Sequence, residues 1–511
     1  MRRQHGCFLI SLFVLSLIWG APMFSQSISK QDYVWLFGGI SYSELLEVDF
    51  KKKPVEFKIR VGGLNFSTNN TSISDKHGNL LLYSNGCAVA DRNHQIMPNG
   101  DSINSGIFFD LFWTGDCQLG YPGLQDVIIL PDPGDSLGYY LLHKPTEYNR
   151  DLNPSIFLQF LKYTYIDLKL NGGTGDVVSK NNILLNTRLL SSYLTAINHS
   201  NQRDWWILQP KDNSNTYYTI LLDSTGFSQI DSQSIGLKFD PKYASDGGEA
   251  RFSPDGKKYA CFNLADGLFL FDFDRDSGQL SNFKHLNFRD TIFLDFGNLE
   301  FSPDSRFLYV SSADSLWQID LTKEDLNDGK QLIDVWNGTQ DPFDTKFFDA
   351  VLAPDCKIYI RPPTSVFSMH VINHPNKKGK ACDFQQNAIS IPTYLDNGTF
   401  PNFPRFRVDE EVCDTSFTTT LQELSYDRLA LNLYPNPSHS VVHLEFDIRM
   451  SGQLQIFDVG LQSIIFKSEI YDTDLYTLDI DDFPLGQYFI QFIPFSNPDR
   501  VFYTGRFVKV E

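Results

Sequence analysis

The sequence predicts an all-β protein: a β-propeller with six or seven blades, seven being favoured, followed by a small C-terminal β-sandwich. Three observations predict this fold class: an aromatic-rich composition, a repeated hairpin in the middle of the chain, and alternating apolar residues near its end. The 511 residues include 43 Phe and 23 Tyr but only 5 Met. Aromatic side chains favour the pleated, half-buried surface of a sheet, so the composition favours β structure.

The first 25 residues have the pattern of a secretory signal peptide. Arg2 and Arg3 precede an apolar stretch, and small residues follow near Ser25. The alternative is a membrane anchor, but a spanning helix needs a longer apolar run of about 20 residues. No later segment is apolar enough to span a bilayer. We therefore expect an exported mature chain without a transmembrane segment.

Three segments in the middle of the chain repeat one hairpin pattern. They begin at residues 247, 297 and 348, and their prolines, Pro254, Pro303 and Pro354, lie 49 and 51 residues apart. In each segment a short apolar strand meets a Ser/Ala-Pro-Asp-x turn, and a second strand containing Tyr follows. Proline suits the second position of a type I turn, and Asp and Gly suit the positions after it. Each repeat is therefore predicted to be a β-hairpin.

Three earlier segments, at 71–86, 124–145 and 193–210, show the same rhythm with less regular turns. Six hairpins, each followed by room for two more strands, indicate units of about 40–50 residues with four strands, which are typical of propeller blades. A seventh blade is expected if the first strand, 32–39, pairs with strands near 389–406. The competing fold is a pair of β-sandwiches, which the fixed hairpin period argues against.

The hairpins resemble the blades of WD40-like propellers of the PD40 kind. Residues 72–100, with the later motifs YYLLHKP, RDWWIL and FPNFPRF, are similar to propeller regions of exported surface proteins of Bacteroidetes. The resemblance covers residues 31–408. It implies a propeller fold but no particular activity, because propellers carry many functions.

A second domain is predicted at residues 430–511, after a polar linker at 409–429. Val442, Leu444 and Phe446 alternate with polar residues, which is the pattern of a half-buried strand. The length of the segment and about seven short strands suit a small β-sandwich.

This tail resembles the type A C-terminal sorting domain of type IX secretion cargo. Gln487 departs from the small or β-branched residue usual in that family. The resemblance implies a partner, the type IX secretion machinery, and passage across the outer membrane to cell-surface attachment or release. A carbohydrate-binding or fibronectin-like sandwich is the alternative. The candidate sorting-signal residues are Tyr434, Pro435, Asn436, Pro437, Gly486, Tyr488 and Lys509.

Composition and motifs argue against several functions. The formal net charge is −19 and no stripe of Lys and Arg occurs, so nucleic acid is not expected as a partner. No nucleophile elbow, zinc-protease motif, phosphate loop or metal-ligand spacing occurs in the sequence. We therefore expect no metal and no cofactor and assign no catalytic residue. Whether the protein is an enzyme stays open, with non-enzymatic binding favoured.

Six cysteines remain once Cys7 is removed with the signal peptide. An even number in an exported protein allows disulfides. The pair Cys356–Cys382 is favoured because the two residues flank one repeat. Unpaired, buried cysteines are the alternative.

One position of the repeat suggests a ligand site. When the hairpins are aligned on proline, Glu249, Asn298 and Asp349 are equivalent, and Gln125 matches from an earlier hairpin. The first strand of each hairpin is expected to line the central channel of a propeller. A ring of acids and amides at the channel mouth would suit a cation, a sugar or a peptide amine. The alternative is that these residues cap hairpins or bond a neighbouring blade.

Two functional hypotheses follow. In the first, the chain is a secreted or surface-attached propeller that binds an extracellular carbohydrate, peptide or protein, delivered by its sorting domain. In the second, it is an extracellular hydrolase or lyase whose active site lies at the channel mouth. The absence of a catalytic motif from the sequence favours binding. Propeller enzymes can, however, assemble an active site from acidic residues of separate blades, which leaves no continuous motif in the sequence.

Overall fold

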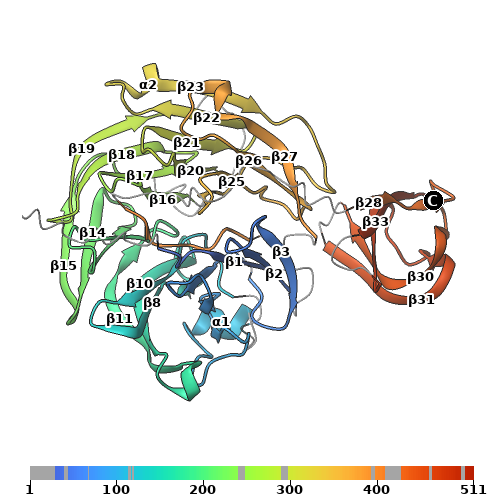
Figure 1. Cartoon of the computed structure of the whole chain (residues 1–511), viewed down its shortest axis with the longest axis horizontal. Coiled ribbons are helices and arrows are strands. Elements are labelled where there is room, and N and C mark those ends of the chain that lie inside the picture. Colours follow the sequence, from blue (N-terminus) through green and yellow to red (C-terminus); the bar gives the residue numbers. More distant parts are fainter. Residues whose placement is uncertain are drawn as a thin grey trace, which may run out of the picture.

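The computed structural model describes residues 29–38, 44–66, 68–112, 117, 120–239, 248–288, 297–392, 398–408, 427–459, 463–496 and 501–511. The expected signal peptide at 1–25 and residues 409–426 of the expected linker lie outside this part of the chain. Within it, seven antiparallel sheets form a ring, and an eighth sheet forms a separate C-terminal domain (Figure 1). The predicted fold class is confirmed, with seven blades.

The blades follow one another along the chain, and each is numbered here in sequence order. In Figure 1 the first strand of a blade lies near the middle of the ring and the last lies at its edge. Blade 1 contains β1 (Val34–Gly38), β2 (Glu44–Asp49) and β3 (Glu56–Val61), and blade 2 contains β4 (Thr71–Ser74), β5 (Leu80–Ser84) and β6 (Val89–Asp91). Blade 3 contains β7 (Val127–Asp132), β8 (Asp135–His143), β10 (Ile156–Asp167) and β11 (Asp176–Leu189), with β9 (Thr146–Tyr148) paired to β10. Blade 4 contains β12 (Thr195–Asn198), β13 (Trp205–Pro210), β14 (Thr216–Asp223) and β15 (Gly226–Ser234).

The three remaining blades carry the strict repeat. Blade 5 contains β16 (Glu249–Phe252), β17 (Lys258–Asn263), β18 (Gly267–Asp274) and β19 (Gln279–Leu286). Blade 6 contains β20 (Gly297–Phe301), β21 (Phe307–Ser312), β22 (Ser315–Asp320) and β23 (Lys330–Val335). Blade 7 contains β24 (Ala350–Leu352), β25 (Ile358–Ile360), β26 (Ser368–Ile372) and β27 (Phe384–Ser390). The short helices are α1 (Ile107–Phe112), α2 (Leu326–Gly329) and the 3₁₀ turns η1 (Asn171–Gly173) and η2 (Gly379–Cys382).

The repeated turn is built from its own side chains. Ser253 Oγ donates to Asp255 Oδ1 at 2.6 Å, and Ser302 and Asp304 make the same bond in blade 6. The residue after Asp has a left-handed backbone, with φ of 69° at Gly256, 59° at Ser305 and 69° at Cys356. A type I turn followed by a left-handed residue matches the twist of the two strands it joins, so the Pro-Asp-x sequence forms a hairpin at each repeat.

Apolar side chains pack between consecutive blades around the whole ring. One cluster joins blades 2, 3 and 4, and further clusters join blades 4 and 5, 5 and 6, 6 and 7, 7 and 1, and 1 and 2. A single blade leaves both of its faces unburied, whereas in a closed ring each face packs against a neighbour.

Residues 398–408, which we call the central segment, cross the middle of the ring. In Figure 1 they are the orange stretch that runs between the inner strands of opposite blades. The expected pairing of the first strand with strands near 389–406 is wrong, because β1 forms its ladder with β2. The central segment lies beside β1 through ring contacts instead: Phe400 is 5.3 Å from Trp35 and 5.5 Å from Phe37, measured between ring centroids.

The C-terminal domain is one curled sheet around its own apolar core. Two of its strands, 441–458 and 463–479, are long and change register where they pair with each other. Because each takes the place of more than one short strand, the domain has six strands among the described residues instead of the seven short ones expected. The strands are β28 (Asp427–Ala430), β29 (Asn432–Tyr434), β30 (Val441–Asp458), β31 (Ser463–Asp479), β32 (Gly486–Pro494) and β33 (Val501–Lys509), in the order β28-β33-β32-β30-β29 with β31 on the other side of β30.

The C-terminal domain contacts the propeller beside blades 1 and 7 (Figure 1). Phe457 and Phe489 join the apolar cluster of those blades, and the ring of Phe489 lies 5.9 Å from that of Phe367. Arg506 donates to the carbonyl oxygen of Pro342 at 3.2 Å. The domain therefore presents one apolar face to its own core and a smaller one to the propeller.

The cysteines do not pair as expected. Cys87 and Cys117 form a disulfide, whereas Cys382 is a free thiol, so the predicted bond between Cys356 and Cys382 is wrong. Cys382 is buried in the apolar cluster between blades 6 and 7, while Cys356 lies at the left-handed position of the blade 7 turn. Flanking the same repeat does not bring two residues together, because the hairpin and its outer strands separate them.

Candidate functional site

The candidate sorting motif begins with Tyr434-Pro435-Asn436-Pro437, which leads from β29 towards β30. The Asn436 side chain bonds the backbone of the last strand, as the main chain of a neighbouring strand would. Its Nδ2 donates to Arg506 O at 2.7 Å, and its Oδ1 accepts from Val508 N at 3.0 Å. Two residues later Ser438 exchanges backbone hydrogen bonds with Val508 and Val510. The start of the domain is thereby tied to its last strand.

The lysine of the last strand, Lys509, reaches back to the middle of the domain. Lys509 is buried, and its Nζ donates to the carbonyl oxygens of Ile480 at 2.7 Å and Asp481 at 3.2 Å. Its backbone pairs with Gly486 at the start of β32. An ammonium group that donates hydrogen bonds to the carbonyl oxygens of a turn orders that turn without needing a carboxylate.

The third part of the motif packs on the same strand. The ring of Tyr488 stacks on Phe507 with centroids 5.1 Å apart, and its hydroxyl donates to Pro484 O at 2.5 Å. Tyr434 and Leu485 stay exposed, at 40% and 58%. Three stretches that are up to 75 residues apart in sequence, from Tyr434 to Lys509, thus form one corner of the domain. This geometry suits recognition by another protein, because it orders a surface and leaves an aromatic and an aliphatic side chain on it.

The second candidate site is the central channel. Glu249, Asn298, Asp349 and Gln125 lie on or just before the first strands of their blades, as expected, and all four are at most 1% exposed. Asn298 Nδ2 donates to Asp349 Oδ1 at 2.6 Å, and Gln125 bonds the backbone of Ala250 through both its amide nitrogen, at 3.2 Å, and its oxygen, at 2.8 Å. These contacts join blades 3 and 5 and blades 6 and 7. Binding of a ligand by the four residues stays a prediction.

An arginine completes this group. Arg251, on β16, lies 2.6 Å from Glu249, 3.6 Å from Glu300 and 3.8 Å from Asp349, measured between the nearest nitrogen and oxygen atoms. Burial raises the pKa of the Glu249 carboxyl well above its ordinary value, although Arg251 opposes the shift, and burial raises the pKa of Asp349 in the same way. Two neighbouring buried carboxyls with raised pKa values favour a shared proton over two negative charges.

The central segment fills the channel and contacts all seven blades. Asn402 holds the carbonyl oxygens of Val127 in blade 3 and Leu194 in blade 4, both at 2.9 Å, through its side-chain amide. Further hydrogen bonds and ion pairs reach the other blades. They join Asn402 to Asn70 and Thr71 in blade 2, Arg405 to Ala196, Phe252 and Glu300 in blades 4, 5 and 6, Phe400 to Asp349 before blade 7, and Arg407 to Asp32 before blade 1.

A small pocket of about 30 Å³ lies between the central segment and the inner strands. Sequence reasoning missed its charged residues. The alternation of arginines with aromatic residues in the stretch Phe403-Pro404-Arg405-Phe406-Arg407 was the available signal, because an arginine that is buried among aromatic side chains needs a partner for its charge. The charged lining residues are Asp32, Arg251, Glu300, Arg405 and Arg407.

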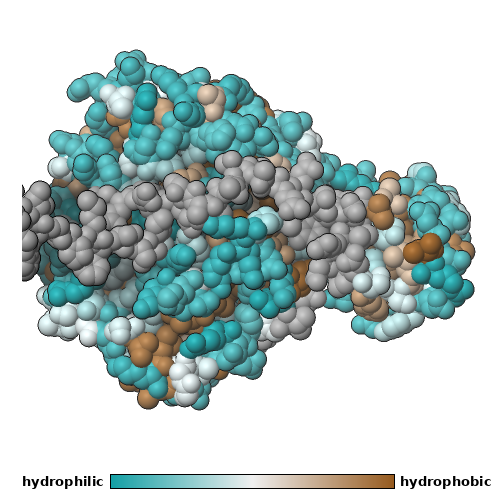
Figure 2. All heavy atoms as spheres, in the orientation of Figure 1, coloured by the Kyte–Doolittle hydropathy of each residue, from teal (hydrophilic) through white to brown (hydrophobic). Residues whose placement is uncertain are grey.

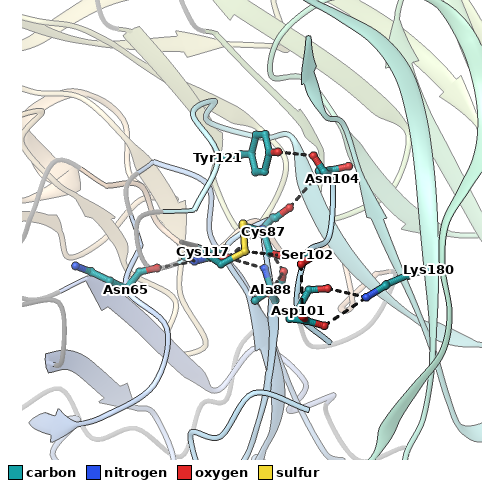
Figure 3. The surroundings of a disulfide bond; sticks show 12 residues. Asn65, Cys87, Ala88, Asp101, Ser102, Asn104, Cys117, Tyr121 and Lys180 are labelled. Atoms are coloured by element: carbon teal, nitrogen blue, oxygen red, sulfur yellow. Dashed lines mark hydrogen bonds and ion pairs between the residues drawn. A yellow bond between two sulfur atoms is a disulfide. The ribbon is translucent and has the colours of Figure 1, made fainter. Parts of the chain in front are cut away.

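Outside the channel, the disulfide between Cys87 and Cys117 links the segment that contains α1 to blade 2 (Figure 3). Asn85 Nδ2 donates to Cys117 O at 2.8 Å, and the Tyr121 hydroxyl bonds Asn104 O next to it. Several large apolar side chains of α1 and blade 3 are exposed: Ile107, Leu111, Leu152, Ile156, Val178 and Ile183. Figure 2 shows brown patches toward the lower edge of the ring, the region in which Figure 1 places α1 and blade 3.

Two other kinds of site are absent from the described residues. No group of three or more His, Cys, Asp or Glu side chains in that part of the chain is placed to hold a metal ion. None of the helices described there is long and apolar enough to cross a membrane.

Comparison with known proteins identifies the tail. Residues 432–497 match the family model described as "Secretion system C-terminal sorting domain". The C-terminal domain is therefore a type IX sorting domain, as predicted, and it implies export across the outer membrane to the surface or the medium. No curated protein matches the chain.

Solved structures show only low similarity. The periplasmic gluconolactonase PpgL of Pseudomonas aeruginosa has 11% identity and a TM-score of 0.35, over 72% of this chain and 97% of that one. The β-propeller domain of Cps50 (Swd1) from Myceliophteria thermophila has 10% identity and a TM-score of 0.34, over 66% and 94%. The dihydro-heme d1 dehydrogenase NirN has 10% identity and a TM-score of 0.37, over 90% and 78%. These values carry no argument about activity or ligand, and the propeller assignment rests on the strand topology.

Proposed function

We propose that this chain is a cargo of type IX secretion, exported by an N-terminal signal peptide, in which the propeller binds an extracellular carbohydrate, peptide or protein. The sorting domain carries the proposal, because its three motif segments form one ordered corner at the end of the chain. We further propose a bacterium of the Bacteroidetes as its source, and attachment to the cell surface or release as its destination.

The propeller supports binding better than catalysis. Its buried channel residues bond the chain's own central segment and neighbouring blades, which favours a rigid scaffold. The apolar side chains on α1 and blade 3 suit a protein partner, since exposed apolar patches commonly mark interaction surfaces.

The alternative function is an extracellular hydrolase or lyase with its active site at the channel mouth. One observation favours it: Glu249 and Asp349 are neighbouring buried carboxyls with raised pKa values, as in an acid that donates a proton. A hydrolysis screen on the full chain separates the two hypotheses. Turnover that disappears in Glu249→Gln would refute pure binding.

Delivery is tested by deletion of residues 427–511. We expect the truncated chain to accumulate in the periplasm, because the corner around Asn436 and Lys509 is removed as a unit. The propeller keeps its central segment in this truncation and so should stay folded. Fractionation with a protease-accessibility assay on intact cells measures the outcome, and normal surface display of the truncated chain would contradict the assignment.

A further inference from the structure

The surface by which the sorting domain meets the propeller is formed by one face of β30 and β32. Successive residues of a strand point to opposite faces of the sheet. Ile456 and Ile490 point into the core of the sorting domain, whereas Phe457, Phe489 and Ile493 pack on the apolar cluster of blades 1 and 7. We call the second surface the docking face, and the residues of β30 and β32 that make it up are Gln453, Gln455, Phe457, Phe489, Gln491 and Ile493.

Two buried glutamines lie in the middle of the docking face. Gln455 and Gln491 are opposite each other in the ladder, next to the opposed pair Phe457 and Phe489, and both glutamines are 0% exposed. Gln455 Nε2 donates to Gln453 Oε1 at 2.8 Å. Among the described residues, Gln455 Oε1 and both polar atoms of the Gln491 side chain have no hydrogen-bond partner. The docked arrangement therefore buries three side-chain polar atoms without giving them a bond.

The docking face both holds the domains together and weakens their contact. The ring of Phe489 lies 5.9 Å from that of Phe367, and beside the face Arg506 donates to Pro342 O at 3.2 Å, so apolar packing and a hydrogen bond favour docking. The unpaired amide of Gln491 opposes docking, because a buried donor or acceptor without a partner keeps the whole cost of losing water. Permanent interfaces are more apolar than this. A contact with both properties suits a domain that docks reversibly.

We propose that the propeller is a reversible, autoinhibitory cover over the sorting domain, and that the docking face is uncovered before the secretion machinery moves the chain across the outer membrane. The proposal deepens the proposed function and rests on it, because it assigns a regulation to the same sorting domain. Undocking exposes Phe457 and Phe489 to water, which is unfavourable, but it returns hydrogen bonds to the amides of Gln455 and Gln491. The two effects oppose each other, so the open state is a minor but accessible one.

Single-molecule fluorescence energy transfer on the full chain measures the undocked fraction. One dye is attached at Ile448→Cys in the sorting domain and the other at Lys58→Cys in blade 1, both exposed positions, while the free thiols Cys261 and Cys382 are buried. We expect two populations of molecules, with the low-transfer, undocked population at about 1–10% of the total. The urea transition of the sorting domain shows that this domain is folded in each labelled chain.

Variants of the docking face should shift this equilibrium in opposite directions. Gln491→Met keeps a side chain of similar length without the unpaired amide, so the undocked fraction should fall about tenfold. Gln487→Met, at an exposed position two residues before Phe489 on the same strand, is the matched control and should change nothing. Arg506→Gln removes the bond to Pro342 O and should raise the undocked fraction about threefold or more. An undocked fraction that Gln491→Met leaves unchanged or raises would overturn the proposal, as would the absence of undocked molecules from both the labelled parent chain and Arg506→Gln.

Export of the same full-length variants tests whether the cover inhibits delivery. Gln491→Met should slow the appearance of the chain on the cell surface several-fold, measured by protease accessibility over time. The double variant with Gln491→Met and Arg506→Gln should recover much of the rate, because the second change weakens docking again. Export of Gln491→Met at the normal rate would overturn the inhibitory role. A double variant that stays as slow as Gln491→Met would do so too, because Gln491 would then be needed for export itself.

The cover can fail without the proposed function failing. If the docked fraction has no influence on export, while deletion of residues 427–511 still retains the chain in the periplasm, the cover is refuted and the sorting role stands. Normal surface display of the chain that lacks residues 427–511 would refute the sorting role itself, whatever the docking equilibrium.

Discussion

The propeller and the sorting domain are both all-β, but they are held closed in different ways. The propeller ring is completed by the central segment, whose side chains and backbone bond the inner edges of all seven blades. Among the described residues this segment forms a single isolated strand bridge, between Ile197 and Arg405. The sorting domain is completed by strand pairing, in which β33 lies between β28 and β32 and is also tied to the Asn436 turn. The propeller therefore depends on buried polar side chains, and the sorting domain depends on a backbone ladder.

This difference determines where each domain is vulnerable. A buried amide that satisfies several carbonyl oxygens cannot be replaced by water, so its loss leaves those oxygens unpaired. An amide at the surface can be replaced by solvent, and the surrounding ladder survives. Urea unfolding of the full chain, with a separate probe for each domain, measures the loss of stability that each substitution causes.

The largest effect is expected from the double substitution Cys87→Ser and Cys117→Ser. The disulfide closes a separation of 30 residues, and loss of such a loop constraint costs about 3 kcal/mol. The propeller transition should shift to lower urea and the sorting-domain transition should not, because residues 427–511 contain no cysteine. A shift of both transitions would show that the two domains unfold as one unit.

The substitution Asn402→Ala tests the central segment. It removes the donors to Val127 O and Leu194 O in two blades, and we expect a loss of about 2–3 kcal/mol from the propeller for these unpaired buried carbonyls. The matched control is Asn432→Ala, an exposed asparagine that bonds Glu445 in the sorting domain. If Asn402→Ala costs no more than this control, the segment does not close the ring.

Acid should weaken the propeller through two buried histidines. Burial lowers the pKa of His143 to about 3 and that of His370 to about 4, whereas the unfolded chain titrates near the ordinary value of 6.5. The unfolded state therefore binds more protons below pH 6.5, and the stability present above that pH is lost as the pH falls, by roughly 1 kcal/mol per pH unit for each group. Unfolding measured from pH 7 to pH 5.5 should show this slope.

The slope can be assigned by substitution. His143→Gln should reduce it, because the imidazole that bonds Asn104 and Thr164 is gone, whereas His443→Gln on the exposed surface of the sorting domain should not. An unchanged slope in His143→Gln would contradict the assignment.

The smallest effect is expected from Asn436→Ala. It breaks the two bonds to β33, but both are solvent-exposed, so we expect a loss of about 1 kcal/mol or less, confined to the sorting domain. A secretion defect in a folded Asn436→Ala chain would show that the corner is recognised directly. A loss as large as that of Asn402→Ala would contradict the contrast between the two domains.

Particular residues show how much of the structure the sequence predicted. The three Ser/Ala-Pro-Asp-x turns were predictable because the turn chemistry lies within four consecutive residues, and the alternation of Val442, Leu444 and Phe446 predicted a core face in the same local way. The strand position of Glu249, Asn298 and Asp349 also followed from the repeat. Their partners did not, since Arg251, Phe400 and the neighbouring blades come from separate parts of the chain.

The sequence by itself determined a repeated hairpin and a C-terminal domain with sorting motifs, and it predicted an N-terminal signal peptide. Only the tertiary structure decided which cysteines pair, that β1 joins β2, and that residues 398–408 occupy the channel. The physical reason is range: turn formation and strand alternation depend on neighbours in the chain, whereas closing a ring depends on which buried donors and acceptors meet across hundreds of residues. Asn402 and Val127, 275 residues apart, meet in this way.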